Sequence, residues 1–305
     1  MLILRSATPA DSAAIRGILE AAEPYDRLAR VDSHGVGLWR DPETWSDVVV
    51  AEMDHAVVGY GALLWPTGPA ARAAEVVVHP AWRRRNIGRQ LALRLQGMPG
   101  SPAPALQGIY SSHVPAAAAF VAAMGCETLG RWRFMLADPP PSLGAVALPE
   151  GYRLRHPVIG RDESAFVDIF SAAFKGHRFM EPPTLHQIRQ RWRSPEFDPR
   201  SCILADCAGQ IIGMSSVRPT SVYRGDRLVK AGYIWVIGTH ADHRNRGIAR
   251  AMLGESVNFM RDQGWEIASL DVDELNRPAQ RLYRALGFAP VYDRVWWRLP
   301  ASAAC

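Results

Sequence analysis

The chain has 305 residues, of which 48% are hydrophobic and 21% charged, and its formal net charge is +5. This length suggests two domains of ordinary size, and the composition excludes a disordered or fibrous chain. No apolar stretch is long enough for a signal peptide or a membrane span, so a cytoplasmic location is predicted. The four cysteines are scattered without CxxC spacing, and therefore neither a disulfide framework nor a metal site is expected.

The first half of the chain reads as a mixed α/β unit. A short strand from Leu4 precedes an amphipathic helix, and "VVVAEMDHAVVGYGALL" from Val48 reads as two strands joined by a tight turn. An arginine-rich segment at residues 80–95 opens another helix, and "AFVAAMGC" closes a further one. The proline-rich residues 138–151 then read as a linker.

The second half repeats this order. Segments that begin at Leu154 and Cys202 echo the earlier strand–helix and hairpin patterns. The arginine segments recur 161 residues apart and the closing Gly125 recurs as Gly287, 162 residues later. Similar offsets in a fixed order indicate two copies of one α/β fold.

The predicted domains are therefore residues 1–137, a linker at 138–151, and residues 152–305. Residues 1–150 carry 13 Lys and Arg against 14 Asp and Glu, whereas residues 151–305 carry 22 against 16. An anionic partner should accordingly favour the second half.

The sequence around residue 245 predicts an anion-binding turn. A β-rich run from Tyr233 to Thr239 leads into a turn with Arg244 and Arg246, and Gly247 precedes a helix. The apolar stripe expected on this helix is Ile248, Met252, Leu253, Val257 and Met260. Backbone N–H groups at such a helix start bind anions, and a pyrophosphate fits this charge. Neither GxGxxG nor GxxxxGK[ST] occurs in the chain.

The segment from Arg244 to Ala249 matches the R/Q-x-x-G-x-G/A signature of the GCN5-related N-acetyltransferase (GNAT) family. Residues 270–288 resemble the next conserved segment of that family, with Asn276, Tyr283 and the final Gly-Phe in place. The similarity covers essentially the whole chain as two copies, and the tandem arrangement resembles mycothiol synthase-like members of the superfamily. The resemblance implies two tandem GNAT folds, each a central mixed, mostly antiparallel twisted sheet flanked by helices.

The resemblance also implies that acetyl-CoA, or another acyl-CoA, is the acyl donor. Its pantetheine arm would pair like an added strand with the backbones of Ile237 and Thr239. Its diphosphate would lie on the turn, with Asn276 completing the site. The residues expected on the turn are Arg244, Asn245, Arg246, Gly247, Ile248, Ala249 and Arg250.

A catalytic tyrosine is implied in the second copy. Asn276 and Tyr283 are seven residues apart, so they share a face of one helix. The resemblance gives Tyr283 the role of proton donor to the departing thiolate. The first copy holds Val114 and Val121 at these places, and Asn86 replaces the first signature glycine. Because valine cannot donate a proton, the first copy is expected to be degenerate and the second catalytic.

The general base is left open by the sequence. Many family members place a glutamate eleven residues before the first signature residue, where this chain has Tyr233. Asp271 and Asp273 are the alternatives on the next strand, where they share one face. His240 and water are further alternatives.

Three functions fit these features. The leading one is an N-acyltransferase that moves an acetyl or other acyl group from acyl-CoA directly to a primary amine of a small molecule. The second takes the acyl group from an aminoacyl-tRNA, supported by the basic run "HQIRQRWR" at residues 186–193. The third is a non-catalytic acyl-CoA-binding module. The duplication also predicts a monomer that forms an internal pseudo-dimer.

Overall fold

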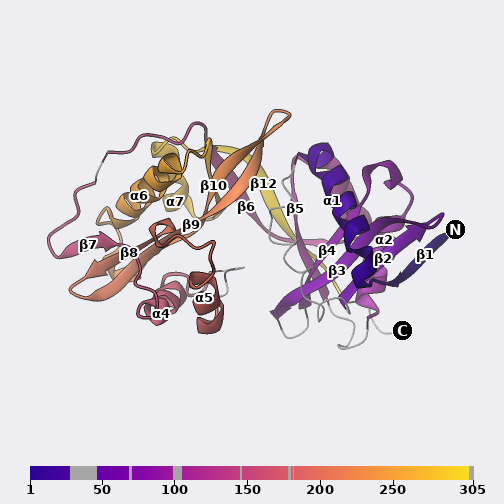
Figure 1. Ribbon diagram of the computed structural model, residues 1–305, viewed down its shortest axis with the longest axis horizontal. Helices are drawn as coiled ribbons and strands as arrows, with labels where there is room; N and C mark the ends of the chain where they lie inside the picture. The colour runs from indigo at the N-terminus through magenta and orange to yellow at the C-terminus, as the bar shows by residue number, and fades with distance from the viewer. Residues whose placement is uncertain are drawn as a thin grey trace.

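The computed structural model describes all residues except 28–46, 69–70, 99–104, 145, 178–179, 181 and 302–305. Helices and strands alternate in both halves of the molecule, so the predicted mixed α/β class is confirmed (Figure 1). The cysteines within the described ranges are free thiols, whereas Cys305 lies outside those ranges.

The two halves contain the elements in the predicted order. The first half contains β1 (Leu2–Ser6), α1 (Ser12–Asp26), β2 (Val48–Met53), β3 (Ala56–Gly68), β4 (Ala71–Val78), α2 (Ile87–Gln96), β5 (Ala105–Ser111), α3 (Pro115–Ala123) and β6 (Glu127–Ala137). The second half contains β7 (Tyr152–Arg155), α4 (Glu163–Ala173), α5 (Leu185–Trp192), β8 (Cys202–Cys207), β9 (Gln210–Arg224), β10 (Arg227–Thr239), α6 (Ile248–Asp262), β11 (Ile267–Asp273), α7 (Arg277–Ala285) and β12 (Ala289–Leu299).

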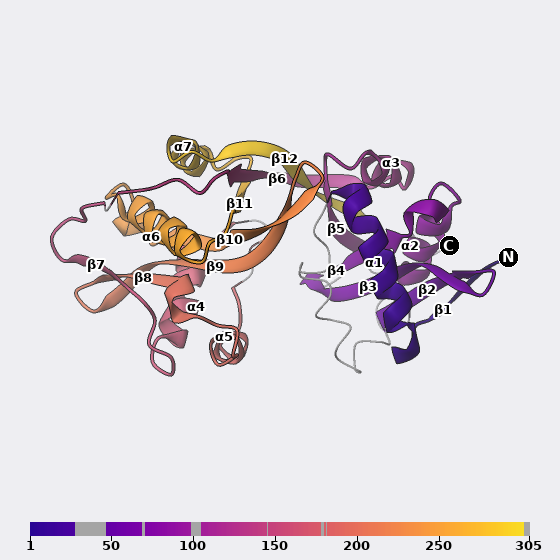
Figure 2. The same ribbon diagram turned by 45° about the horizontal axis from the view of Figure 1, so that its top comes forward.

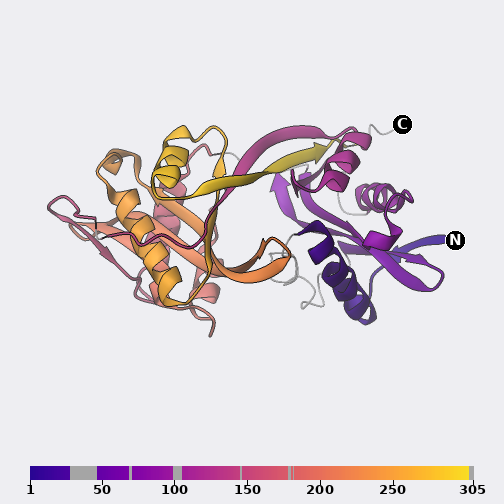
Figure 3. The ribbon, with the colours of Figure 1, turned by 90° about the horizontal axis from the view of Figure 1, so that it is seen from above.

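These strands form one continuous sheet in the order β1-β2-β3-β4-β5-β12-β6-β11-β10-β9-β8-β7. The last strand of the second half, β12, lies between β5 and β6 of the first half. Strand β6 in turn pairs with β11 of the second half. Figures 2 and 3 show β6 and β12 running side by side across the middle of the molecule. Each half therefore receives the final strand of the other.

The exchange also joins the two hydrophobic cores. Trp297 of β12 packs into the core of the first half with Leu106, and Met135 of β6 packs into the core of the second half with Val257. The adjacent Trp296 points to the other face, as strand alternation requires, and contacts an aromatic ring of β6. The proposed division of the chain at residues 138–151 stays a prediction about the repeat along the sequence. In space, each core contains side chains from both halves.

Helix α6 follows the signature turn and carries the predicted apolar stripe. All five stripe residues are buried, and Gly264 beyond the helix end has the left-handed φ of +67° that stops such helices. Ile248 and Met252 pack on Ile203 of β8, while the next β8 side chain, Leu204, faces α4 and α5 on the other side of the sheet. Each such buried aliphatic side chain contributes about 1.5–3 kcal/mol.

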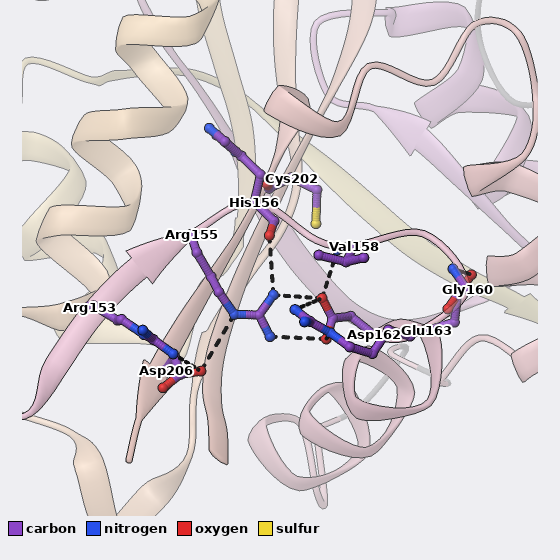
Figure 4. Close-up of polar contacts among 10 residues, drawn as sticks. Arg153, Arg155, His156, Val158, Gly160, Asp162, Glu163, Cys202 and Asp206 are labelled. Carbon is purple, nitrogen blue, oxygen red and sulfur yellow. Dashed lines mark hydrogen bonds and ion pairs between the residues drawn. The ribbon is translucent and has the colours of Figure 1, made fainter. Parts of the chain in front are cut away.

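An ion-pair network ties the first strand of the second half to its first helix. Arg155 binds Asp162 through Nη1 at 2.6 Å and Nη2 at 3.0 Å, and its Nε lies 3.5 Å from Asp206 (Figure 4). The backbone N–H of Val158 donates to the same Asp162 carboxylate at 2.7 Å. The first half repeats the network with Arg5, Asp11 and Glu52. This shared device supports the duplication and serves the fold.

Replacing Asp162 with asparagine should lower the free energy of unfolding at pH 7 by up to about 3 kcal/mol, because Arg155 loses its two short contacts and keeps only the longer one with Asp206. Burial raises the pKa of the Asp162 carboxyl, but the hydrogen bonds from Arg155 and Arg161 lower it by more than burial raises it. The resulting pKa lies well below the usual range. The carboxylate therefore stabilises the fold above about pH 4 and loses this effect as the pH falls. Urea unfolding at several pH values tests both expectations. The exposed pair of Asp198 and Arg200 supplies the control, since Asp198→Asn should change stability much less.

Candidate active site

Strands β10 and β11 separate at the centre of the second half. They pair in parallel only along Ala231–Ile234 and Ile267–Leu270, although β10 continues to Thr239 and β11 to Asp273. A register shift between Ile234 and Val236 accompanies the divergence. The gap is a narrow crevice of about 60 Å³. The predicted site residues that line it are Ile237, Asp271, Asp273, Asn276 and Tyr283. The structure thus brings together residues from three elements.

The turn after β10 has an open helix start. Asn245 and Gly247 have φ values of +61° and +79°, and Gly247 is the N-cap of α6, which has no side-chain cap. The N–H groups of Ile248, Ala249 and Arg250 belong to the first helical turn, where no intrahelical partner exists. Such a terminus can bind the diphosphate of CoA, so these residues fit the predicted role.

The arginines of the turn differ in their surroundings. Arg244 donates through Nε to the carbonyl of Thr239 at 3.1 Å and through Nη2 to that of Ala173 at 3.1 Å, and it therefore holds the turn against β10 and α4. Arg246 is exposed, and its guanidinium carbon lies 5.8 Å from the ring centre of Tyr152. Direct contact of either arginine with phosphate stays a prediction.

The first copy keeps the shape of this turn. Asn86, which departs from the signature glycine, has a φ of +64° and is the N-cap of α2. Arg83 donates to the carbonyl of Val78 at 3.0 Å, as Arg244 does in the second copy. A hollow of about 420 Å³ lies beside the turn between β4 and α3. Helix α3, which borders this hollow, lacks a side-chain cap because its N-cap residue is Val114. The first copy has thus retained the turn without the polar helix start.

Replacing Gly247 with valine should weaken CoA binding at least tenfold. The φ of +79° is strained for a β-branched residue by about 1–2 kcal/mol, and relaxation of the turn would redirect the N–H groups of α6. Gly247→Asn is the matched control, because Asn86 and Asn245 already adopt this conformation in the same chain. Calorimetry with CoA measures both variants. Unchanged affinity of the valine variant would remove the diphosphate from this turn.

Tyr283 lies inside the second core rather than on the surface. Asn276 caps its helix, since Oδ1 accepts the N–H of Ala279 at 3.2 Å, and Tyr283 is only 6% exposed where it lines the crevice. Its ring contacts Phe288, and its hydroxyl makes no hydrogen bond with the described residues. Burial raises the pKa of the phenol above its ordinary value. The hydroxyl therefore stays protonated and is able to donate.

Asp271 is the most enclosed carboxylate of the crevice, with a side chain 3% exposed. Its Oδ2 accepts the hydroxyl of Tyr233 at 2.9 Å and lies 3.2 Å from Nε of Arg294. Its Oδ1 is buried and has no hydrogen-bond partner among the described residues. Burial raises the pKa of this carboxyl above its ordinary value, while Arg294 and the Tyr233 hydroxyl oppose the rise.

Asp273 is engaged differently. Its Oδ1 accepts the N–H of Leu275 at 2.8 Å, and its Oδ2 lies 3.8 Å from Nε2 of His177. His240, another alternative for the base, caps the turn at residues 241–243 and borders a separate hollow near Arg155. Of the proposed bases, the two aspartates therefore share the crevice and His240 does not.

Three residues around the crevice were not found from the sequence. Trp132 comes from β6 and Arg294 from β12, the exchanged strands, and His177 follows α4. Trp132 packs edge-on against His177, with ring centres 6.2 Å apart, and its buried Nε1 has no hydrogen-bond partner among the described residues. No local motif marks these positions, because Trp132 and Arg294 reach the site only through the strand exchange and His177 only through the packing of the segment after α4.

The basic run at residues 186–193 lies on α5. Arg189 and Arg193 are exposed, but the guanidinium carbon of Arg191 lies 5.6 Å from the ring centre of Trp235. Arg218 lies over the same ring at 4.0 Å. The run is therefore not a uniformly solvated face.

Within the described ranges, no group of three or more His, Cys, Asp or Glu side chains could hold a metal ion. None of the helices in these ranges is long and apolar enough to cross a membrane.

The open helix start after β10, the splayed strand pair and Tyr283 beside it are the features that the sequence led us to expect of an acyltransferase. Residues 164–288 match the acetyltransferase (GNAT) family and residues 44–125 match an acetyltransferase (GNAT) domain. The chain belongs to the GNAT family and is an acetyltransferase. Acetyltransferases of this family use acetyl-CoA.

Relatives with the same architecture cover nearly the full chain. The mycothiol acetyltransferase of Thermomonospora curvata is 31% identical over 291 residues, which cover 94% of this chain and 93% of the relative. That of Thermobispora bispora is 31% identical over 287 residues, covering 92% and 93%. A tandem GNAT protein from the clavulanic acid biosynthesis pathway has a TM-score of 0.75 at 20% identity, with all of both chains covered. The predicted tandem GNAT fold is confirmed.

Proposed function

We propose that this chain transfers the acetyl group of acetyl-CoA directly to a primary amine of a small molecule. The observation that carries the proposal is the crevice between β10 and β11, which Asp271 and Tyr283 line together. The similarity to mycothiol acetyltransferases along nearly the whole chain supports a small-molecule acceptor. The sheet continuous through β6 and β12 supports a monomer, because the two copies already pair within one chain.

The residues of the second copy fit the donor. The first-turn N–H groups of α6 would hold the diphosphate. Beyond Ile234, β10 pairs with β9 but no longer with β11, so the backbone near Ile237 and Thr239 offers an edge to the pantetheine arm. The Oγ1 of Thr239 is buried and lacks a partner among the described residues, which also favours a ligand here. Asn276 would act through the cap of the helix that carries Tyr283.

Acetyl-CoA supplies the acetyl group as a thioester, so a nitrogen–carbon bond forms as the carbon–sulfur bond breaks. The amine must lose a proton, and the sulfur must gain one. We assign the first proton to Asp271, whose raised pKa and unpartnered Oδ1 suit a base in a buried site. The proton that the sulfur gains comes from Tyr283 in this assignment, because its hydroxyl stays protonated at neutral pH. Asp273 remains the alternative base.

The test uses the purified full chain with acetyl-CoA and a panel of small primary amines, including amino sugars and amino acid derivatives. Release of the CoA thiol should accompany a product heavier by one acetyl group, and the product should be an amide. Binding of CoA without turnover of any amine would favour the non-catalytic module. Turnover only with a charged tRNA, with steep salt dependence, would favour the aminoacyl-tRNA alternative.

A further inference from the structure

We propose that Arg294 and Tyr233 are positioning residues for Asp271: together they hold its Oδ2, so that Oδ1 is left to receive the N–H of the acceptor amine. This inference rests on the proposed amine acetylation. Tyr233 stands where many family members have a glutamate, and the carboxylate is supplied instead by the neighbouring strand. The chain thereby keeps an acid group at the crevice while using a different strand to carry it.

The positions of the three groups follow from strand pairing. In the sheet, Arg294 of β12 is the register partner of Trp132 on β6, which is in turn the partner of Asp273 on β11. Two strand spacings amount to about 9.6 Å. The Arg294 side chain spans this distance diagonally, passing 5.1 Å from the ring centre of Phe134, the register partner of Asp271.

The contacts of Asp271 leave one carboxylate oxygen for a ligand. Tyr233 donates a hydrogen bond to Oδ2 at 2.9 Å, whereas Arg294 Nε lies 3.2 Å from the same oxygen as an ion pair without hydrogen-bond geometry. Oδ1 is buried at the crevice without a partner among the described residues. A buried carboxylate oxygen that lacks a donor is unfavourable, and a bound amine would supply the missing N–H. The unpartnered oxygen thus belongs to the carboxylate to which we assign the role of general base.

Other charged groups near this carboxylate are engaged separately. The remaining titratable and charged side chains on the surrounding elements are Arg218 of β9, Tyr292 of β12, Asp273 of β11, His177 after α4, and Arg133 of β6, which faces the other side of the sheet. Arg218 lies over Trp235, Arg133 bonds Asp293, and Asp273 faces His177. Only Arg294, among the arginines of the described ranges, forms an ion pair with Asp271.

The exchanged strand therefore has a consequence for catalysis. Arg294 reaches Asp271 because β12 has crossed into the first half and β6 has taken its place beside β11. The base of the second copy is thus positioned by residues that span the junction of the two copies. A local pair on β10 and β11 alone would lack the positive charge.

The experiment measures the pH dependence of kcat/KM for wild type, Arg294→Gln, Arg294→Lys and Tyr233→Phe, using an amine that wild type acetylates. Loss of the positive charge should move the acidic limb of the profile to higher pH and lower kcat/KM at pH 7 by about tenfold or more. Arg294→Lys should recover part of the shift, and Tyr233→Phe should move the limb in the same direction by less. The affinity for CoA should not change.

Arg298→Gln is the matched control, because Arg298 lies on the same strand and pairs with the exposed Glu127. Its pH profile should equal that of wild type. A rate loss in Arg294→Gln with an unmoved acidic limb would assign Arg294 a merely structural role and overturn the inference. A second readout is independent of turnover: in protein labelled with ¹³C at aspartate carboxyls, the Asp271 signal should titrate at higher pH in Arg294→Gln. If wild type acetylates no amine, the proposed function fails, and this titration still decides the role of Arg294.

Discussion

Asp271→Asn should lower kcat/KM for acetyl transfer by about 10²–10⁴-fold at neutral pH, because the amide cannot take the proton of the amine. The fold should survive, since asparagine retains the shape of the side chain and can still accept from Tyr233. In wild type, activity should rise with pH as the Asp271 carboxyl ionises, in a range set above its ordinary pKa by burial. Steady-state kinetics from pH 4 to 9 measures both effects.

Asp273→Asn supplies the comparison within the same strand. Its Oδ1 already accepts the N–H of Leu275, so the variant should mainly alter the turn before α7 and cost far less activity than Asp271→Asn. The reverse order of effects would transfer the role of base to Asp273, with His177 beside it at 3.8 Å. If both variants were as active as wild type, neither aspartate would be the base. Water would then accept the proton, or the amine would reach the site already neutral.

Tyr283→Phe should lower turnover by about tenfold to a thousandfold while the affinity for acetyl-CoA and for the amine barely changes. The substitution keeps the ring against Phe288 and removes only the hydroxyl, which makes no hydrogen bond with the described residues. The donor would therefore matter only as negative charge develops on the leaving sulfur. Single-turnover kinetics separates this step from product release.

Tyr223→Phe is the control for loss of a phenol, because Tyr223 lies near the far hairpin end of β9 and outside the crevice. Wild-type turnover of Tyr283→Phe, with chemistry shown to be rate-limiting, would exclude the tyrosine as proton donor. The repeat already contains the natural counterpart of this change, since the first copy has Val121 at the corresponding position. Activity confined to the second copy would follow from that difference.

Local patterns in the sequence accounted for much of the fold. The apolar stripe of α6, the stop at Gly264 and the cap at Asn276 depend on residues within a few helical turns, so their periodicity was readable along the chain. The seven-residue spacing of Asn276 and Tyr283 placed both on one face, and both line the crevice. The duplication was equally visible because corresponding segments recur at nearly constant offsets. The sequence identified Asp271 and Asp273 as a pair on one strand face. It did not show that Asp271 is buried beside Arg294 while Asp273 accepts a backbone N–H.

The sequence by itself determined the two copies, their element order and the signature turn, because these are properties of neighbouring residues. Tertiary structure alone decided that β6 and β12 cross between the halves, and therefore that Trp132 lines the crevice and Arg294 reaches Asp271. It also brought His177, which follows α4, beside Asp273. The physical reason is that a strand's own sequence specifies its alternation of faces but not its partner. An uncrossed and a crossed arrangement satisfy the same alternation, and the choice between them is made by side chains packing from distant parts of the chain, such as Trp297 in the first core and Met135 in the second.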